Sequence, residues 1–248
     1  MKAVKTEFMK QKKQLLLLCV VFPLLLNGLL YVDLQYRYES YLLKHQSEYG
    51  LSCWQLIFKE QTIFYFSELF HAVAAALVYE IFAVDLKSNG WMLVASSKYR
   101  NRKVIYGKFM VACIGALIFW VSDYCSLYFV GSSIGVQGGF EAGLFLKSFL
   151  IQLSSAIMII AFFIFLVCVI RRVVYLIAFG VLFLVLNIAV YYGKEIRFLI
   201  QYPFSYISHC FRASTKECLL SIGISLVLGG MLFFGAEHML KRNRDLSL

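Results

Sequence analysis

The sequence predicts an all-α integral membrane protein. Of its 248 residues 61% are hydrophobic and only 15% are charged, and the mean hydropathy is +0.75. A soluble domain is about half apolar and about a quarter charged. The apolar residues form long, uninterrupted runs rather than alternating with polar residues, which favours helices over a β-barrel. We expect a single transmembrane domain over residues 1–248, with no room for a separate soluble domain.

Six apolar runs approach the roughly 20 residues that a helix needs to cross the hydrocarbon core. The six predicted spans are Leu15–Val32, Thr62–Ala83, Val104–Val130, Leu144–Ile170, Val173–Tyr192 and Leu219–Leu240. The fourth and fifth are separated by Arg171 and Arg172 alone, which predicts a helical hairpin that turns at two arginines.

The distribution of Lys and Arg predicts the orientation. These residues are concentrated before the first span, between spans two and three, at the Arg171–Arg172 turn and after the sixth span, and they are fewer in the alternate segments. Because cytoplasmic loops carry the excess of positive charge, we expect both termini in the cytoplasm. The same bias accounts for the net charge of +10 without a nucleic-acid partner, since the cations are split among loops.

Three segments outside the spans have a predicted structure. Residues 1–14 are basic and lead into an apolar run with no cleavage site, so they predict an amphipathic cytoplasmic helix before a retained span. Residues 33–60 form a larger outer segment of mixed charge with aromatic side chains. Residues 194–218 are apolar but interrupted by Pro203, and we expect an external re-entrant element there, between spans five and six.

The loop 84–103 contains the most informative pattern. Between the two spans the loop contains five cations and only one acid. It also contains an apolar run, Trp91, Met92, Leu93 and Val94. This composition predicts a short amphipathic helix along the cytoplasmic surface, with its apolar side toward the membrane or a partner.

The order of residues in this region resembles a signature of the type-2 ABC exporter permeases. The matching positions are Asp85, Gly90, Ser96, Ser97, Arg100, Arg102, Lys103, Gly107 and Lys108. Trp91 and Lys98 stand where the family has Thr and Pro, and the match covers about 30 residues. The resemblance implies a helix that couples the permease to an ATPase, and an external re-entrant element between spans five and six. The residues it assigns to this contact are Asp85, Gly90, Trp91, Met92, Leu93, Arg100, Arg102 and Lys103.

Further expectations follow from the resemblance. It implies a multi-pass subunit of the bacterial plasma membrane that pairs with a second permease chain, identical or related. Two separate ABC ATPase subunits would bind ATP and Mg²⁺, while this chain would bind no cofactor or metal and would not be an enzyme. The aromatic spans favour an amphipathic cargo, and by analogy we expect an antimicrobial or cytolytic peptide.

Ionisable residues inside the spans are candidates for the transport pathway or for polar contacts between helices. Glu68 and His71 form a Glu-x-x-His pair, for which we expect a contact between helices or exposure near the outer mouth. Di-metal bundles need this motif twice, so it does not predict a metal site. Glu80 and Asp123 are expected to pair or to face a cavity, and Lys108 to extend to the cytoplasmic interface.

The sequence contains no catalytic signature. Gly107-Lys108 lacks the upstream glycine of a P-loop, so ATP hydrolysis is not expected on this chain. Cys53, Cys210 and Cys218 fall in the predicted outer segments, where a disulfide is an open possibility. Two alternative functions remain at this stage, an ion-coupled secondary transporter and a non-transporting sensor or immunity protein that binds a peptide. The first is disfavoured by the lack of an internal repeat, and the second by the coupling-helix pattern.

Overall fold

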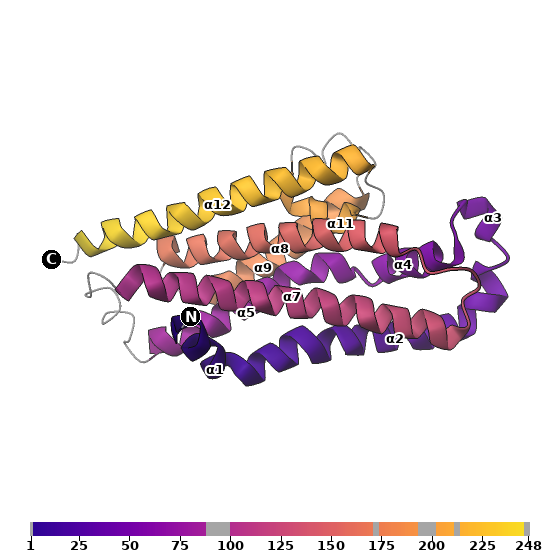
Figure 1. The fold of residues 1–248 in the computed structure, drawn as a ribbon, viewed down its shortest axis with the longest axis horizontal. Helices are drawn as coiled ribbons and strands as arrows, with labels where there is room; N and C mark the ends of the chain where they lie inside the picture. Colours follow the sequence, from indigo (N-terminus) through magenta and orange to yellow (C-terminus); the bar gives the residue numbers. More distant parts are fainter. Residues whose placement is uncertain (1, 88–99, 171–173, 193–201, 211–213, 246–248) are drawn as a thin grey trace.

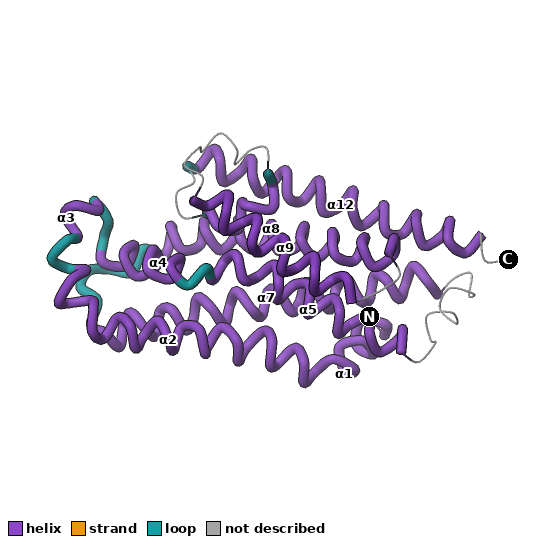
Figure 2. Tube along the Cα trace, turned by 180° about the vertical axis from the view of Figure 1, so that it is seen from behind, coloured by secondary structure: helices purple, strands orange, loops and turns teal. Residues whose placement is uncertain are grey.

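The computed structural model describes residues 2–87, 100–170, 174–192, 202–210 and 214–245. Within these ranges the chain is helical with short connections and contains no strand (Figures 1 and 2). The elements are α1 Lys2–Leu16, a π-helical turn Leu17–Val21, α2 Phe22–Arg37, a second π-helical turn Tyr38–Leu42, α3 Gln46–Tyr49, α4 Cys53–Ile63, α5 Phe66–Lys87, α7 Arg100–Ile134, α8 Ala142–Ile170, α9 Val174–Tyr192, a 3₁₀ turn Pro203–Ser205, α11 Tyr206–His209 and α12 Thr215–Asp245. The prediction of an all-α fold is confirmed.

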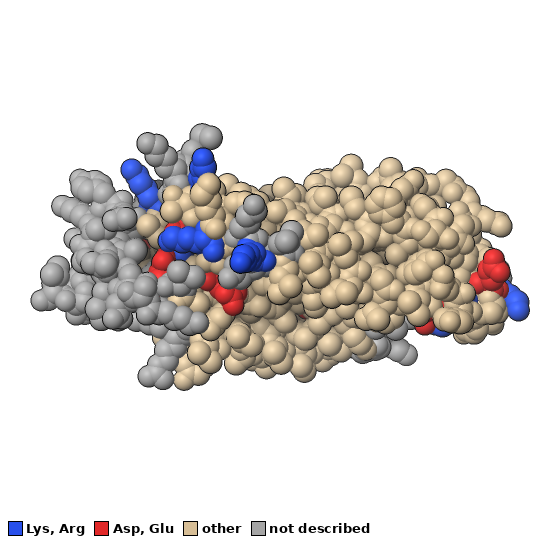
Figure 3. All heavy atoms as spheres, turned by 90° about the horizontal axis from the view of Figure 1, so that it is seen from below, with Lys and Arg blue, Asp and Glu red and all other residues tan. Residues whose placement is uncertain are grey.

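Five helical segments in the described chain are long and apolar enough to cross a membrane. They are Leu17–Leu42, Phe66–Ala83, Lys103–Ile134, Ala142–Ile170 and Thr215–Leu240. The fifth predicted span, Val173–Tyr192, corresponds to α9, whose apolar part, Val174–Ala189, is shorter. The architecture is therefore that of a multi-pass membrane protein. Figure 3 agrees with it, because the charged side chains on the face shown lie toward its two ends and the middle of that face carries almost none.

The helices pack as an elongated bundle with α5 and α8 in the interior. α8 packs against α12, α5 against α9, and α2 against α7. The apolar window of α5 is 67% buried, whereas that of α12 is 22% buried. Accordingly, α2 and α12 form opposite edges of the bundle in Figures 1 and 2. Their outer faces expose apolar side chains such as Leu25 and Val227, as lipid-facing helices do.

Two predicted boundaries are wrong. The first span was predicted to end at Val32, but the helix continues to Leu42, because Leu34, Tyr38 and Leu42 extend its buried face. The π-helical turn over the last five residues lets side chains four positions apart stay on that face.

The second predicted span begins at Thr62. Instead α4 ends at Ile63 and α5 begins at Phe66. Between them Tyr65 adopts φ +52°, in the left-handed region that a non-glycine residue seldom occupies. The break separates the short helix α4 from the long apolar helix α5.

Part of the predicted re-entrant segment 194–218 is described. Residues 202–210 form the 3₁₀ turn and α11, and Ser205, Tyr206 and Ile207 are buried. The following helix begins at Thr215, four residues before the predicted start of the sixth span at Leu219. None of the seven cysteines, all of which lie in the described ranges, forms a disulfide, and this includes Cys53, Cys210 and Cys218.

Aromatic side chains fill the core between α4, α7 and α8 at the end of the bundle that carries α3. Trp54 on α4 contacts Phe140 with ring centroids 5.1 Å apart and Tyr128 at 5.7 Å. Its indole lies directly on α7 at Gly131, where an added Cβ would be 2.4 Å from Trp54 Cζ3. Only glycine leaves room for the ring there.

Replacing Gly131 by alanine is therefore expected to destabilise the protein by about 1–3 kcal/mol, as overpacking does. Gly28→Ala is the matched control, since a Cβ at Gly28 meets nothing within 4 Å and removes backbone freedom from the unfolded chain. Thermal unfolding in detergent measures both variants. Equal midpoints for the two variants would contradict this packing, and Trp54→Phe should partly rescue Gly131→Ala.

Candidate functional site

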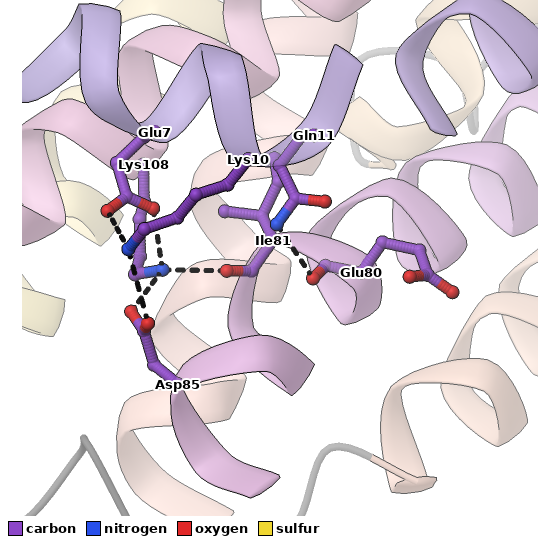
Figure 4. Close-up of polar contacts among 7 residues, drawn as sticks. All are labelled: Glu7, Lys10, Gln11, Glu80, Ile81, Asp85 and Lys108. Carbon is purple, nitrogen blue, oxygen red and sulfur yellow. Dashed lines mark hydrogen bonds and ion pairs between the residues drawn. The ribbon is translucent and has the colours of Figure 1, made fainter. Parts of the chain in front are cut away.

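A buried ion-pair cluster joins α1 to the facing ends of α5 and α7 (Figure 4). Lys108 on α7 is 0% exposed, and its Nζ lies 3.0 Å from Glu7 Oε2 and 2.7 Å from Asp85 Oδ2. The same ammonium donates to the Ile81 carbonyl oxygen at 2.6 Å. Lys10 Nζ approaches the other oxygens of both acids, at 2.9 Å from Glu7 Oε1 and 3.4 Å from Asp85 Oδ1. We call Glu7, Lys10, Asp85 and Lys108 the Lys108 cluster.

Helical spacing brings these side chains to the interface. On α1 the buried residues Glu7, Gln11 and Leu15 follow one another at intervals of four, so that one face of this helix carries an acid, an amide and a leucine. Gln11 Nε2 donates to the Glu80 carbonyl oxygen at 3.2 Å, which adds a second contact between α1 and α5. The amphipathic helix predicted for residues 1–14 therefore packs on the membrane helices through polar contacts.

The cluster is balanced in charge and in hydrogen bonds. Two carboxylates face two ammonium groups, and Lys108 has three N–H donors for its three oxygen partners. A buried ion pair adds little net stability over an apolar equivalent, but removal of one partner strands a buried charge. The cluster therefore fixes how three helices meet more than it stabilises the fold.

The contacts of Asp85 and Lys10 favour the charged forms of these two side chains. Burial opposes ionisation of Asp85, but the hydrogen bond and the charge of Lys108, and then those of Lys10, outweigh it and lower its pKa below the usual 3.8. Burial also acts to lower the pKa of Lys10, and its contacts with Glu7 and Asp85 raise it above 10.5. Asp85 and Lys10 thus remain charged at neutral pH.

The cluster includes one of the residues that we expected to couple to an ATPase. Asp85 directs its carboxylate to Lys108 and Lys10, and its side chain is only 13% exposed. Lys103, on α7, is exposed. Gly90, Trp91, Met92 and Leu93 lie outside the described residues, as do the side chains of Arg100 and Arg102 at the start of α7.

A second polar cluster surrounds Asp123, further along α7 from Lys108. Asp123 Oδ1 accepts from Gln61 Nε2 at 2.6 Å and from Asn27 Nδ2 at 2.8 Å. Asn27 Nδ2 also lies 2.7 Å from Ser126 Oγ. These contacts connect α2, α4 and α7, so Asp123 takes part in a contact between helices, one of its two predicted roles. Lys108 and Asp123 are both buried residues of α7.

Glu68 and His71 are buried, at 1% and 0% exposure, so the predicted alternative of exposure near the outer mouth is wrong. His71 Nδ1 lies 3.0 Å from the Glu68 carbonyl oxygen, and Nε2 lies 3.2 Å from Asn187 Nδ2 on α9. The pair therefore makes a contact between helices, which was the other expectation. Glu80 contributes its backbone carbonyl to the α1 contact (Figure 4).

Lys108 does not extend to the cytoplasmic interface as predicted. Its ammonium stays inside because Glu7 and Asp85 provide buried counter-charges, which an ammonium requires away from water. The sequence alone did not identify the roles of Glu7, Lys10, Gln11 and Gln61 in these clusters. The available signal was a lysine within a predicted span, which requires an acid from another helix. Among the described residues no group of three or more His, Cys, Asp and Glu side chains could hold a metal ion.

The comparisons with known proteins identify no relative. No model of a protein family matches the chain, and neither the curated proteins nor the solved structures contain a significant match.

We expect Lys108→Met to cost about 3–5 kcal/mol of unfolding free energy, because it leaves Glu7 and Asp85 without their buried cation. Lys103→Met is the control on the same helix, and as an exposed substitution it should stay within about 0.5 kcal/mol of the wild type. Unfolding in detergent, followed by circular dichroism, measures the difference. Adding Glu7→Gln to Lys108→Met removes one stranded charge and should recover part of the loss. Equal stability of the two lysine variants would contradict the claim that Lys108 neutralises buried carboxylates.

Proposed function

We propose that this chain is the membrane-spanning permease subunit of an ATP-driven ABC exporter. Two such subunits form the pathway, two separate ATPases hydrolyse ATP, and the cargo is an amphipathic peptide of antimicrobial or cytolytic type. One observation supports this proposal most directly. The segment between α5 and α7 is flanked by an ion pair of the Lys108 cluster, with Asp85 before the segment and Lys108 after it.

This arrangement suits a connection that transmits movement. An ion pair between the two helices that flank a segment makes these helices move together. Moving them apart would leave the buried charges without partners. Glu7 extends the same link to α1. A partner that displaced the loop would therefore displace α1, α5 and α7 as one unit, and nucleotide binding to that partner could favour one of two packings.

The proposal includes a topology. In it α9 is the remaining membrane crossing, both termini and residues 84–103 are cytoplasmic, and residues 194–218 re-enter the membrane from outside. In support, the described ends of α1 and α12 lie at the same end of the bundle as the α5–α7 connection, and α3 and α4 lie at the opposite end (Figure 1). The plasma membrane of a bacterium is the proposed location.

Trp91 is the proposed anchor of the ATPase contact, since buried aromatic side chains commonly dominate the binding energy of an interface. Trp91→Ala is expected to abolish co-purification of the ATPase, or its cargo-stimulated hydrolysis, while the permease still inserts and dimerises. Affinity capture of the tagged chain from its native host, with mass spectrometry and ATPase assay, gives both readouts.

Lys98→Ala serves as the control. If the loop 84–103 only rests on anionic lipid, loss of one positive charge weakens it and the neutral Trp91→Ala change does not. A full complement of ATPase with unchanged, cargo-responsive hydrolysis in Trp91→Ala would rule out the coupling role of Trp91.

A further inference from the structure

A row of exposed residues runs from α1 into α2. Its members recur at intervals of four through both helices and through the π-helical turn between them, so each member neighbours the next on the helix surface. We call it the outer row. It consists of Lys5, Met9, Lys13, Leu17, Val21, Leu25 and Leu29.

A second row is buried against the rest of the bundle. It consists of Glu7, Gln11, Leu15, Cys19, Pro23 and Asn27, each of which comes two positions after a member of the outer row. Residues two positions apart lie about 200° apart around a helix, because one turn takes 3.6 residues. Along α1 and the first half of α2, the bundle therefore contacts one side of the chain and the outer row occupies the opposite side.

The outer row changes from basic to apolar where the membrane span begins. Leu17 is the first residue of that span, and further along it Leu25 and Leu29 are 63% and 57% exposed, as lipid-facing side chains are. Lys13 comes one helical turn before Leu17. A lysine just outside an apolar span extends its ammonium to the level of the lipid headgroups.

Lys5 and Lys13 receive no counter-charge from the described part of the chain. Both are exposed, and neither forms an ion pair there. Glu7 is the only acid among residues 1–32, and its carboxylate pairs with Lys108 and Lys10. Met9, which is 66% exposed, adds an apolar side chain between the two lysines. A partner that complements this part of the outer row is therefore anionic and in part apolar.

An anionic phospholipid meets both requirements, because it joins a negatively charged headgroup to acyl chains. We propose that Lys5 and Lys13 bind the headgroups of anionic phospholipids, with Met9 against the acyl chains. The two lysines are ~12 Å apart along α1 at 1.5 Å per residue, so they contact separate headgroups. In the proposed topology these lipids belong to the cytoplasmic leaflet, whose negative potential attracts basic segments beside membrane spans. The binding requires neither an ATPase nor a cargo.

The test measures which lipid contacts the outer row. An apolar fluorophore on Met9→Cys, in an otherwise cysteine-free full chain, takes the place of the exposed methionine. The chain is placed in nanodiscs of phosphatidylcholine and phosphatidylglycerol, and one of the two lipids carries a nitroxide quencher near its headgroup. At equal mole fractions we expect phosphatidylglycerol to be preferred at least about fivefold, the effect of one lysine beside an anionic lipid. High salt should weaken the preference, because it screens exposed charges.

Three paired variants separate this site from the net charge of the chain. Lys5→Gln with Lys13→Gln should bring the preference close to one, and Lys5→Arg with Lys13→Arg should retain it. Lys44→Gln with Lys216→Gln removes the same charge from exposed positions toward the end of the bundle that carries α3, and should also retain it. All of these side chains are exposed, so the unfolding midpoints should stay close to that of the unchanged chain.

Three results would overturn the proposal. Equal quenching by the two lipids would show that the outer row does not select anionic headgroups. An unchanged preference in Lys5→Gln with Lys13→Gln would place the selective site elsewhere. Absence of quenching by either lipid would show that a second copy of the chain, and not lipid, covers Met9 in the nanodisc. Because no ATPase is present, each of these results leaves the Trp91 test of the permease function unaffected.

Discussion

Burial of the Lys108 ammonium is the constraint on which the rest of the arrangement depends. An ammonium inside a membrane protein requires anionic partners at hydrogen-bond distance, and this chain provides them from α1 and from the end of α5. One side chain thus determines how α1, α5 and α7 meet. The helix before the first membrane span becomes part of the bundle, and the segment between α5 and α7 has fixed ends.

α5 carries this constraint through the interior. Asp85 lies near its last turn and Glu68 in its first, and between them Phe70 packs on Phe119 and Trp120 of α7 with ring centroids 5.1 and 5.3 Å apart. Close-packed interiors transmit displacement because they deform little. A change at the Lys108 cluster therefore has a direct route to the first turn of α5.

The sequence predicted those features that depend on local pattern. The apolar run Leu144–Ile170 corresponds to α8 Ala142–Ile170 because continuous hydrophobicity alone defines a membrane helix. The sequence did not predict the break at Tyr65, where φ is +52°, because nothing in the surrounding apolar run indicates it. The partners of Lys108 were missed for a related reason, since Glu7 lies 101 positions away and helical periodicity says nothing about which faces meet. The ATPase contact and the cargo remain predictions from the resemblance of residues 85–108.

The central claim is that the Lys108 cluster holds α1, α5 and α7 as one unit. The direct measurement is the distance between spin labels at Lys13 on α1 and Tyr106 on α7, both exposed, in a cysteine-free background in nanodiscs. The account predicts one narrow distance distribution for the otherwise unchanged chain and for Lys103→Met, and a broad distribution for Lys108→Met. An equally narrow distribution at the same distance in Lys108→Met would contradict it.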